Sequence, residues 1–252
     1  MIDHTLDQIS QLKLAGLKAA LLEQMEQPNH YAEMSFEERL SYLIDREVLD
    51  RKNRKTKRML RASKMKYKPI FSEDIDYQAS RNLNRSVVKS LLQNNWMQQH
   101  QNVVITGPTG TGKTYLACVL GNQAILSGYS VYYTRISPLV SDIAMARAEG
   151  TYPRLMKRMT GFDLLILDDF GLSSLTTGQA QELLEVIEER TGTGSHIFTS
   201  QLPVKEWYSY FNNPTLADAI MDRVIHNAHR LDLKGESMRK VKNRVALSDT
   251  ST

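Results

Sequence analysis

GPTGTGKT, residues Gly107–Thr114, is the stretch that decides the fold of this 252-residue chain. It matches the pattern GxxxxGK[ST], in which glycines let backbone N–H groups curl around phosphate oxygens at the start of a helix. The apolar run VVIT stands directly before it and a helical pattern follows, as such a loop requires. We therefore expect Lys113 to neutralise the β- and γ-phosphates of a nucleotide and Thr114 to hold Mg²⁺.

The whole loop and the residue after it are expected to line the nucleotide. The set is Gly107, Pro108, Thr109, Gly110, Thr111, Gly112, Lys113, Thr114 and Tyr115. A glycine-rich turn that matches the pattern by accident is the alternative. The strand pattern before the loop and the helix pattern after it favour a nucleotide site, with ATP and Mg²⁺ as its ligands.

A second element of phosphate chemistry follows 54 residues after Thr114. The apolar run Leu164–Leu167 is typical of a buried strand, and it ends in Asp168 and Asp169. In a parallel sheet such a strand delivers carboxylates to the edge where ligands bind. We expect Asp168 to hold Mg²⁺ through water and Asp169 to orient or deprotonate the attacking water. A strand that merely ends in an acidic turn is the alternative, and the preceding phosphate loop argues against it.

Short apolar runs and helical patterns alternate on both sides of these motifs. Strands are expected at 102–106, 130–134, 163–168, 196–200 and 230–233. Helices are expected at 113–127, 139–148, 154–160, 177–190 and 215–228. This alternation predicts the α/β fold class, with a mostly parallel sheet covered by helices on both faces.

Composition excludes several classes of protein. Hydrophobic residues make up 41% and charged residues 24% of the chain, which are ordinary globular values and exclude general disorder. The single cysteine, Cys118, excludes a disulfide framework and a thiolate metal cluster. The sequence shows neither a signal-peptide pattern nor an uninterrupted apolar run of about 18 residues. We therefore expect a soluble, cytoplasmic protein with no membrane partner.

The N-terminal part of the chain has a purely helical pattern. Apolar residues recur at helical spacing within residues 4–26. Ser35 and Glu38 form a capping-box sequence at the start of a second helix. Because no proline or glycine follows until Pro69, this helix could run on through the basic segment that precedes Pro69. The predicted domains are a small helical domain, 1–68, and an ATPase domain, 69–252.

Positive charge is concentrated at the end of this helical segment. Residues 51–68 hold ten basic and no acidic residues, which leaves −6 on the rest of a chain whose total charge is +4. If the segment is helical, all of them except Lys52 lie within roughly 200° of the helix circumference. Such a face suits the phosphates of double-stranded DNA; a solvated helix or a partner-binding tail is the alternative. The predicted DNA contacts are Arg51, Arg54, Lys55, Lys57, Arg58, Arg61 and Lys64.

The ordered set of motifs resembles one family of ATPases. Besides the phosphate loop, the set comprises LLILDDFG at 164–171, TSQLP at 199–203, MDRV at 221–224 and GESMRK at 235–240. Together they resemble the IstB-like AAA+ ATPases, helper proteins of bacterial insertion-sequence transposition. The resemblance covers nearly the whole chain, and the ATPase domain is also similar to that of the DnaC/DnaI helicase loaders.

That resemblance implies roles for three further residues. Gln201, at the end of the fourth strand, takes the position of the polar sensor between the phosphate and the catalytic acid. Arg223 takes that of an arginine finger that enters a neighbouring subunit's site, and Arg239 that of a second sensor on the γ-phosphate. A helix cap or an ion pair with Asp218 or Asp222 is the alternative for Arg223. For Arg239 the alternative is a second basic patch.

The chain departs from the usual AAA+ pattern at two positions. Gln201 stands where asparagine is common, and Asp169 where glutamate is common. Both keep the functional group but differ in reach, which puts the rate rather than the mechanism in doubt. Because 13 residues follow Arg239, a separate helical lid is not expected.

The resemblance implies an ATPase that binds DNA, assembles into a homo-oligomer with ATP sites at subunit interfaces, and remodels target DNA. Its remaining partner would be a transposase, which it recruits or activates. A helicase loader with the same ATPase chemistry is the nearest alternative. A nucleotide kinase would need an acceptor pocket and a mobile lid, for which the sequence offers no suitable insertion. An architectural DNA binder with a vestigial site is disfavoured because Lys113, Thr114 and both acids are intact.

Overall fold

The computed structural model describes residues 2–68, 70–77, 81–211 and 213–238. The chain divides into two compact units, Met1–Met59 and Leu60–Thr252. This division falls before the domain boundary expected after residue 68, and that boundary stays a prediction.

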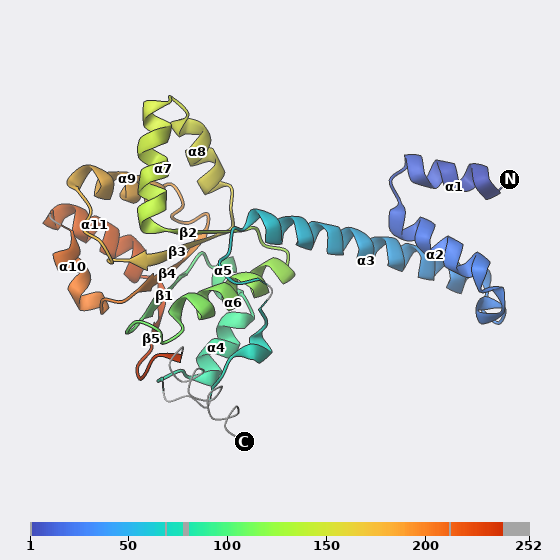
Figure 1. Cartoon of the computed structure of the whole chain (residues 1–252), viewed down its shortest axis with the longest axis horizontal. Coiled ribbons are helices and arrows are strands. Elements are labelled where there is room, and N and C mark those ends of the chain that lie inside the picture. Colours follow the sequence, from blue (N-terminus) through green and yellow to red (C-terminus); the bar gives the residue numbers. More distant parts are fainter. Residues whose placement is uncertain (1, 69, 78–80, 212, 239–252) are drawn as a thin grey trace, which may run out of the picture. The chain divides into compact units, whose positions relative to one another are not determined.

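Helices build the N-terminal unit (Figure 1). They are α1 (Ile2–Gln11), α2 (Ala15–Glu26), the 3₁₀ turn η1 (Pro28–Tyr31) and α3 (Phe36–Ala62), whose last turn belongs to the second unit. The capping box expected at the start of α3 is confirmed. The Ser35 N–H donates to the Glu38 carboxylate at 2.7 Å, and the Glu38 N–H donates to the Ser35 hydroxyl at 3.2 Å.

α2 crosses α3 so closely that only glycine fits at the crossing. A Cβ atom added to Gly16 would lie 2.6 Å from the Arg46 carbonyl oxygen. The Glu47 carboxylate is buried there and accepts the N–H groups of Gly16 at 2.8 Å and Leu17 at 3.1 Å. An acid on α3 thus satisfies the free N–H groups at the positive start of α2.

The sequence suggested a helix that continues through the whole basic segment. In the structure α3 ends earlier, at Ala62. Ser63 and Met65 are buried, and Lys64 between them has a left-handed φ of 53°. The Ser63 carbonyl oxygen accepts the Tyr133 N–H at 2.8 Å. Burial of these residues within the second unit takes the chain out of the helix. Because this is a tertiary effect, no proline or glycine marks the helix end.

A parallel sheet with the strand order β2-β3-β4-β1-β5 forms the centre of the second unit. All five expected strands are confirmed, each within two residues at either end. Their bounds are β1 (Asn102–Thr106), β2 (Val131–Arg135), β3 (Leu164–Phe170), β4 (Ser195–Ser200) and β5 (Ala228–Asp232). β1 and β4 are buried along their whole length, as strands covered on both faces must be.

Helices cover both faces of this sheet (Figure 1), which confirms the α/β fold class. One face carries α4 (Arg85–Leu92), α5 (Asn95–Gln98) and α6 (Lys113–Leu126). The other carries α7 (Ile136–Ala148), α8 (Tyr152–Thr160), α9 (Thr177–Glu188), α10 (Trp207–Tyr210) and α11 (Pro214–Ile225). Sequence periodicity missed α4, and it missed α5, α10 and the 3₁₀ turns η2 (Ser72–Asp74) and η3 (Val204–Glu206), which are too short to show a period. Among the described residues, no helix is long and apolar enough to span a bilayer.

An aromatic cluster fixes the carboxyl end of β3. Phe170, the last residue of that strand, packs on Phe198 of β4 with ring centroids 5.5 Å apart and on Trp207 of α10 at 4.4 Å. All three side chains are fully buried. Because Phe170 directly follows Asp169, this packing holds the two acids at the edge of the sheet.

Candidate functional site

The phosphate loop lies between β1 and α6 and is supported from behind by the segment that follows β5. Its glycines have positive φ angles: 142° at Gly107, 86° at Gly110 and 95° at Gly112. A Cβ atom at Gly107 would lie 2.3 Å from the Leu233 carbonyl oxygen, and one at Gly110 would lie 2.2 Å from Ser237 Oγ. These positions therefore require glycine both for conformation and for space.

Arg81 supports the loop from another side, and no motif in the sequence points to it. Its Nη1 donates to the Thr111 carbonyl at 3.3 Å and would lie 2.8 Å from a Cβ atom at Gly112. Its Nη2 donates to the Asp76 carbonyl. Burial lowers the pKa of Arg81 while the Asp76 charge opposes that shift, and a guanidinium of this kind stays charged. Arg81 thus adds a cation beside the loop that is independent of Lys113.

Lys113 lies inside the loop, as predicted. Its ammonium donates to the carbonyl oxygens of Gly107 at 2.7 Å and Pro108 at 2.9 Å. Burial lowers the pKa of Lys113, and the charges of Asp168 and Asp169 oppose this effect. The ammonium is therefore held where the loop curls, with both acids close enough to act on it.

Asp168 is the centre of the site. Its Oδ1 accepts the Thr114 hydroxyl at 2.8 Å and also the Thr199 hydroxyl. Its Oδ2 accepts the Tyr133 hydroxyl at 2.6 Å. The carboxylate is completely buried. The structure thus brings Thr114 and Asp168 together as the motifs predicted, and it adds two hydroxyl groups that the motifs did not reveal.

Asp169 has an unusual backbone. The pairing of β3 with β4 shifts register between Leu167 and Phe170, and Asp169 within this bulge has a φ of 60°. Aspartate tolerates this left-handed conformation better than most residues, and a bulge turns a side chain away from the regular strand direction. Burial and the neighbouring Asp168 raise the pKa of Asp169, while Lys66, Arg135 and Lys113 oppose the rise. A carboxylate with a raised pKa is a better proton acceptor than an ordinary one.

Gln201 follows β4, which lies between β1 and β3 in the sheet. Its Oε1 accepts the Thr109 hydroxyl of the phosphate loop at 2.7 Å. The predicted polar sensor therefore contacts the loop directly. The glutamine side chain is long enough to reach the loop from the end of β4.

The donor set suits Mg²⁺. The Thr114 hydroxyl and the Asp168 carboxylate offer hard oxygen ligands, and Mg²⁺ is usually held by one or two such groups together with phosphate oxygens and water. Within the described part of the chain, no group of three or more His, Cys, Asp or Glu side chains could hold a metal ion. A site completed by a nucleotide's phosphates therefore fits these residues better than an all-protein metal cage.

Arg223 lies in the last turn of α11 and contacts α9. Its Nη2 pairs with the Glu188 carboxylate at 2.6 Å, and its Nη1 donates to the Ala219 carbonyl at 3.0 Å. Its ion-pair partner is thus Glu188 rather than Asp218 or Asp222. Arg239, the other arginine singled out by the sequence, lies outside the described residues.

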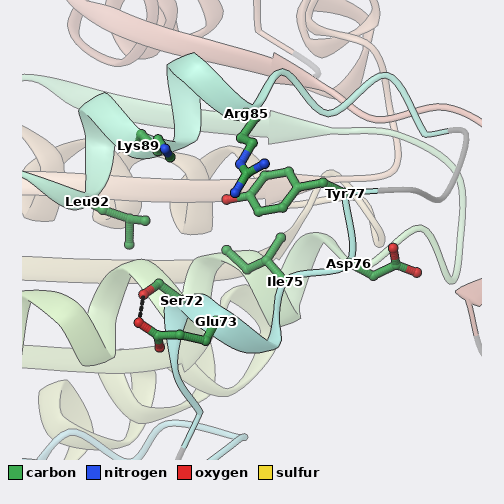
Figure 2. A pocket seen from close by; sticks show the side chains of 8 residues that line it. All are labelled: Ser72, Glu73, Ile75, Asp76, Tyr77, Arg85, Lys89 and Leu92. Atoms are coloured by element: carbon green, nitrogen blue, oxygen red, sulfur yellow. Dashed lines mark hydrogen bonds between the residues drawn. The ribbon is translucent and has the colours of Figure 1, made fainter.

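A pocket of about 560 Å³ is lined by residues that precede the phosphate loop in the chain (Figure 2). Its lining residues are Ser72, Glu73, Ile75, Asp76, Tyr77, Arg85, Lys89 and Leu92. The Arg85 guanidinium lies 5.4 Å from the centre of the Tyr77 ring. Two contacts join this pocket wall to the phosphate loop and α6: Arg81 with the Asp76 carbonyl, and the Tyr115 hydroxyl with the Asp74 carbonyl at 3.5 Å. An aromatic face and apolar side chains thus stand next to the phosphate site.

A separate basic groove of about 640 Å³ lies within the N-terminal unit. Its lining residues are Leu12, Lys13, Arg51, Arg54, Lys55 and Arg58. Lys13 has a left-handed φ of 58° in the turn between α1 and α2, so its contribution could not be read from the run of basic residues. The groove brings a cation from outside the basic segment next to four from within it.

Two basic residues at the start of the segment 51–68 have acidic partners on the preceding turns of α3, although the segment itself holds no acid. Arg51 pairs with Glu47 at 2.7 Å, and Arg54 pairs with Asp50 at 2.8 Å. Further along, Lys64 lies past the helix end with its ammonium 5.6 Å from the centre of the Tyr132 ring. Among the described residues, the unpaired part of the helical basic face therefore consists of the basic residues between Arg54 and Lys64.

Solved structures share the fold of the second unit. The DnaC helicase loader is 19% identical with a TM-score of 0.53, and covers 71% of this chain and 99% of its own. DnaI is 17% identical with a TM-score of 0.57, and covers 70% of this chain and 93% of its own. At this identity the likeness shows the AAA+ fold alone.

Sequence relatives extend over the N-terminal unit as well. An insertion sequence ATP-binding protein of Sinorhizobium fredii, y4pL, is 41% identical over 245 residues, which are 97% of this chain and 99% of the relative. The ATP-binding protein of insertion sequence IS21 from Pseudomonas aeruginosa is 28% identical over 241 residues, 94% and 89% of the two chains. The family model described as IstB-like ATP binding protein matches residues 7–246. The chain therefore belongs to the family of IstB-like ATP-binding proteins, whose relatives named above are ATP-binding proteins of insertion sequences.

Proposed function

We propose that this protein hydrolyses ATP with Mg²⁺ at the site around Lys113. The observation that carries the proposal is the 2.8 Å hydrogen bond between Thr114 of the phosphate loop and Asp168 of β3. These are the two protein groups that P-loop NTPases use to hold the metal ion on the β- and γ-phosphates. When bound, Mg²⁺ would neutralise charge that develops on the phosphate oxygens.

Each remaining group has a task that suits its position. Lys113 would place its positive charge on the terminal phosphates. Asp169 would orient and deprotonate the attacking water, since its raised pKa favours proton uptake. Gln201, which already contacts Thr109 of the loop, would report the presence of the γ-phosphate to β4.

The pocket in Figure 2 is our proposed place for the adenine base. It adjoins the phosphate loop through Arg81 and Tyr115, and Tyr77 offers an aromatic face of the kind that packs on bases. Tyr77→Ala should then weaken ATP binding but leave the affinity for inorganic triphosphate unchanged. Equal losses for both ligands would place the base elsewhere.

Double-stranded DNA is the proposed partner of the basic groove and of the exposed face of α3. The groove gathers five cations within one unit, a density that suits a line of phosphates rather than a single counter-ion. Contacts of this kind carry little sequence information, so we propose that the protein holds the duplex without strong sequence preference.

Self-association is proposed because Arg223 lies at the opposite end of β1 from the phosphate loop of its own chain: its carbonyl accepts the Asn102 side chain at 3.0 Å, at the start of that strand, and its guanidinium contacts Glu188 and Ala219. An arginine finger acts on a neighbour's γ-phosphate, so ATP would favour assembly of subunits. α3 also exposes an apolar stripe in the N-terminal unit, with Phe36 66%, Leu40 43% and Ile44 48% exposed. Exposed stripes of this kind commonly mark protein interfaces.

Transposition is the proposed setting, with a transposase as the partner that the assembly recruits or activates on remodelled DNA. Support comes from relatives that are named as insertion-sequence proteins and that match the N-terminal unit as well as the ATPase unit. A helicase loader of the DnaC/DnaI type is the second candidate. The likeness to those loaders is confined to the fold of about 70% of the chain, which favours the first candidate.

One experiment tests these proposals together. Phosphate release and particle mass would be measured with ATP, in the presence and absence of duplex DNA without chosen sequence. We expect turnover that requires Mg²⁺, larger particles with ATP, and stable complexes with DNA. Turnover without any DNA binding at 50 mM salt would exclude the DNA-remodelling function, and nucleotide binding without turnover would exclude the ATPase.

A further inference from the structure

We infer that Tyr133 is a positioning residue for Asp168, the proposed metal ligand. We further infer that the residues that follow α3 in the chain hold Tyr133 in its position. The inference rests on the proposed Mg–ATP site. Tyr133 lies on β2, outside every motif of the sequence, and its hydroxyl donates to Asp168 Oδ2 at 2.6 Å.

The two oxygens of Asp168 are held from different sides. Thr114 and Thr199 donate to Oδ1, and Tyr133 donates to Oδ2. A carboxylate that is fixed at both oxygens cannot rotate about its Cβ–Cγ bond without breaking one of these bonds. Because Asp168 is completely buried, water cannot replace a lost donor at low cost. Partners in this outer position typically change metal affinity 10- to 100-fold when they are removed.

The phenol is suited to remain a donor. A phenol carries a single O–H donor, and that of Tyr133 is used for Asp168 Oδ2. The hydroxyl therefore orients the carboxylate. Such a group positions the metal ligand but takes no part in the chemical step.

The backbone of Tyr133 is fixed from the outer edge of the sheet. β2 is an edge strand, so the N–H groups on its outer side have no neighbouring strand to pair with. The Ser63 carbonyl accepts the Tyr133 N–H at 2.8 Å. Met65, two residues on, packs against α6, where its sulfur would lie 2.9 Å from a Cβ atom at Gly121. The residues that follow α3 thus set the position of Tyr133, and through its hydroxyl that of Asp168.

Tyr133→Phe tests the inference because it removes only the hydroxyl. Binding of a non-hydrolysable ATP analogue would be measured with Mg²⁺ and with EDTA, and the Mn²⁺ affinity of the analogue complex would be measured by electron paramagnetic resonance. We expect Mn²⁺ affinity to fall about tenfold or more while binding in EDTA is unchanged. Thermal unfolding would show whether the variant is folded.

Tyr132→Phe is the matched control. Tyr132 is the neighbouring residue on β2, and its side chain lies on the other face of the sheet. Its hydroxyl accepts a hydrogen bond from the Arg158 guanidinium at 2.9 Å. This control should leave Mn²⁺ affinity unchanged. Equal Mn²⁺ affinity in wild type and Tyr133→Phe would overturn the inference and leave the proposed ATPase intact. A wild-type protein that binds the analogue equally well with Mg²⁺ and with EDTA would overturn both.

Discussion

The phosphate site and the basic face of α3 are both charged, yet they are built in opposite ways. In the phosphate site Lys113 and Asp168 are buried, and each hydrogen bond has a specific partner. On α3 the cations are exposed, and the ion pairs among the described residues are those of Arg46, Arg51 and Arg54. Buried polar groups act through geometry, because a lost partner is not replaced by water. Exposed charges act through their number, because salt and water screen each of them.

This difference predicts how each region responds to change. A single substitution should disable the phosphate site, and moderate salt should affect it little. A single substitution on α3 should matter little, whereas the removal of several charges or a rise in salt should matter strongly. The predictions below test this contrast, from the largest expected effect to the smallest.

Lys113→Ala should abolish nucleotide binding, because it removes the positive charge that the terminal phosphates require.

Asp169→Asn should bind ATP normally but hydrolyse it at least about a hundredfold more slowly, because an amide cannot accept the proton of the attacking water. Calorimetry and phosphate release would separate the two effects. Unchanged turnover in Asp169→Asn would remove Asp169 from the catalytic residues, whatever the outcome for Lys113.

Arg223→Ala should lower turnover by about three orders of magnitude or more if Arg223 acts as an arginine finger. A mixture of Arg223→Ala with Lys113→Ala protein should recover part of the activity, since one supplies intact sites and the other intact fingers. Glu188→Gln is the control, because it removes the ion pair of Arg223 within its own chain but leaves the arginine in place. Mixtures that assemble but recover no activity would show that Arg223 acts within its own subunit or on structure alone.

Replacing Lys55, Lys57 and Arg58 by glutamine should weaken binding to unrelated duplexes to a similar extent. Each phosphate contact contributes about −0.9 to the slope of log affinity against log salt, so the slope should flatten by about 3. Lys52→Gln is the matched control on the same helix, since Lys52 lies off the predicted basic face. ATP turnover without DNA should be unaffected in both proteins. An unaltered salt slope in the triple variant would move the DNA-binding surface away from α3.

Much of the second unit was predictable because its signals are local. The strands are apolar runs of the right length, and GPTGTGKT fixes a loop whose glycines the structure shows to be required by both φ and space. Thr114 in the first turn of α6, Asp168 near the end of β3 and Gln201 directly after β4 all lie at the carboxyl edge of the sheet, and their roles stay predictions.

The supporting residues were not predictable, because tertiary contacts alone give them a role. Tyr133 and Thr199 lie on buried strands and look like ordinary β-sheet residues until the fold brings them to Asp168. Arg81 belongs to a segment without a motif, and Lys13 to a turn far from the basic run. The end of α3 at Ala62 was missed for the same reason. Charge patterns and motifs point to the candidate reacting groups, whereas the groups that contact and orient them are found only in the structure.

The smallest expected effect concerns Glu47, the one buried acid on α3. It is charged like the exposed cations of that helix, but it is held by specific hydrogen bonds like the groups of the phosphate site. Burial raises its pKa, but the hydrogen bonds from Arg51 and from the Leu17 and Gly16 N–H groups outweigh this and lower the pKa below the ordinary value of 4.5. A lowered folded-state pKa means that the carboxylate stabilises the folded N-terminal unit above about pH 4.5, and that this stability is lost as pH falls through the folded-state pKa. Glu47→Gln should therefore speed amide hydrogen exchange of Gly16 and Leu17 at pH 7, and the difference from wild type should shrink toward pH 3. The exposed Glu33, changed to glutamine, should show neither effect. Exchange rates at Gly16 that are equal in wild type and Glu47→Gln at both pH values would mean that the close crossing of α2 and α3 holds through Gly16 packing alone.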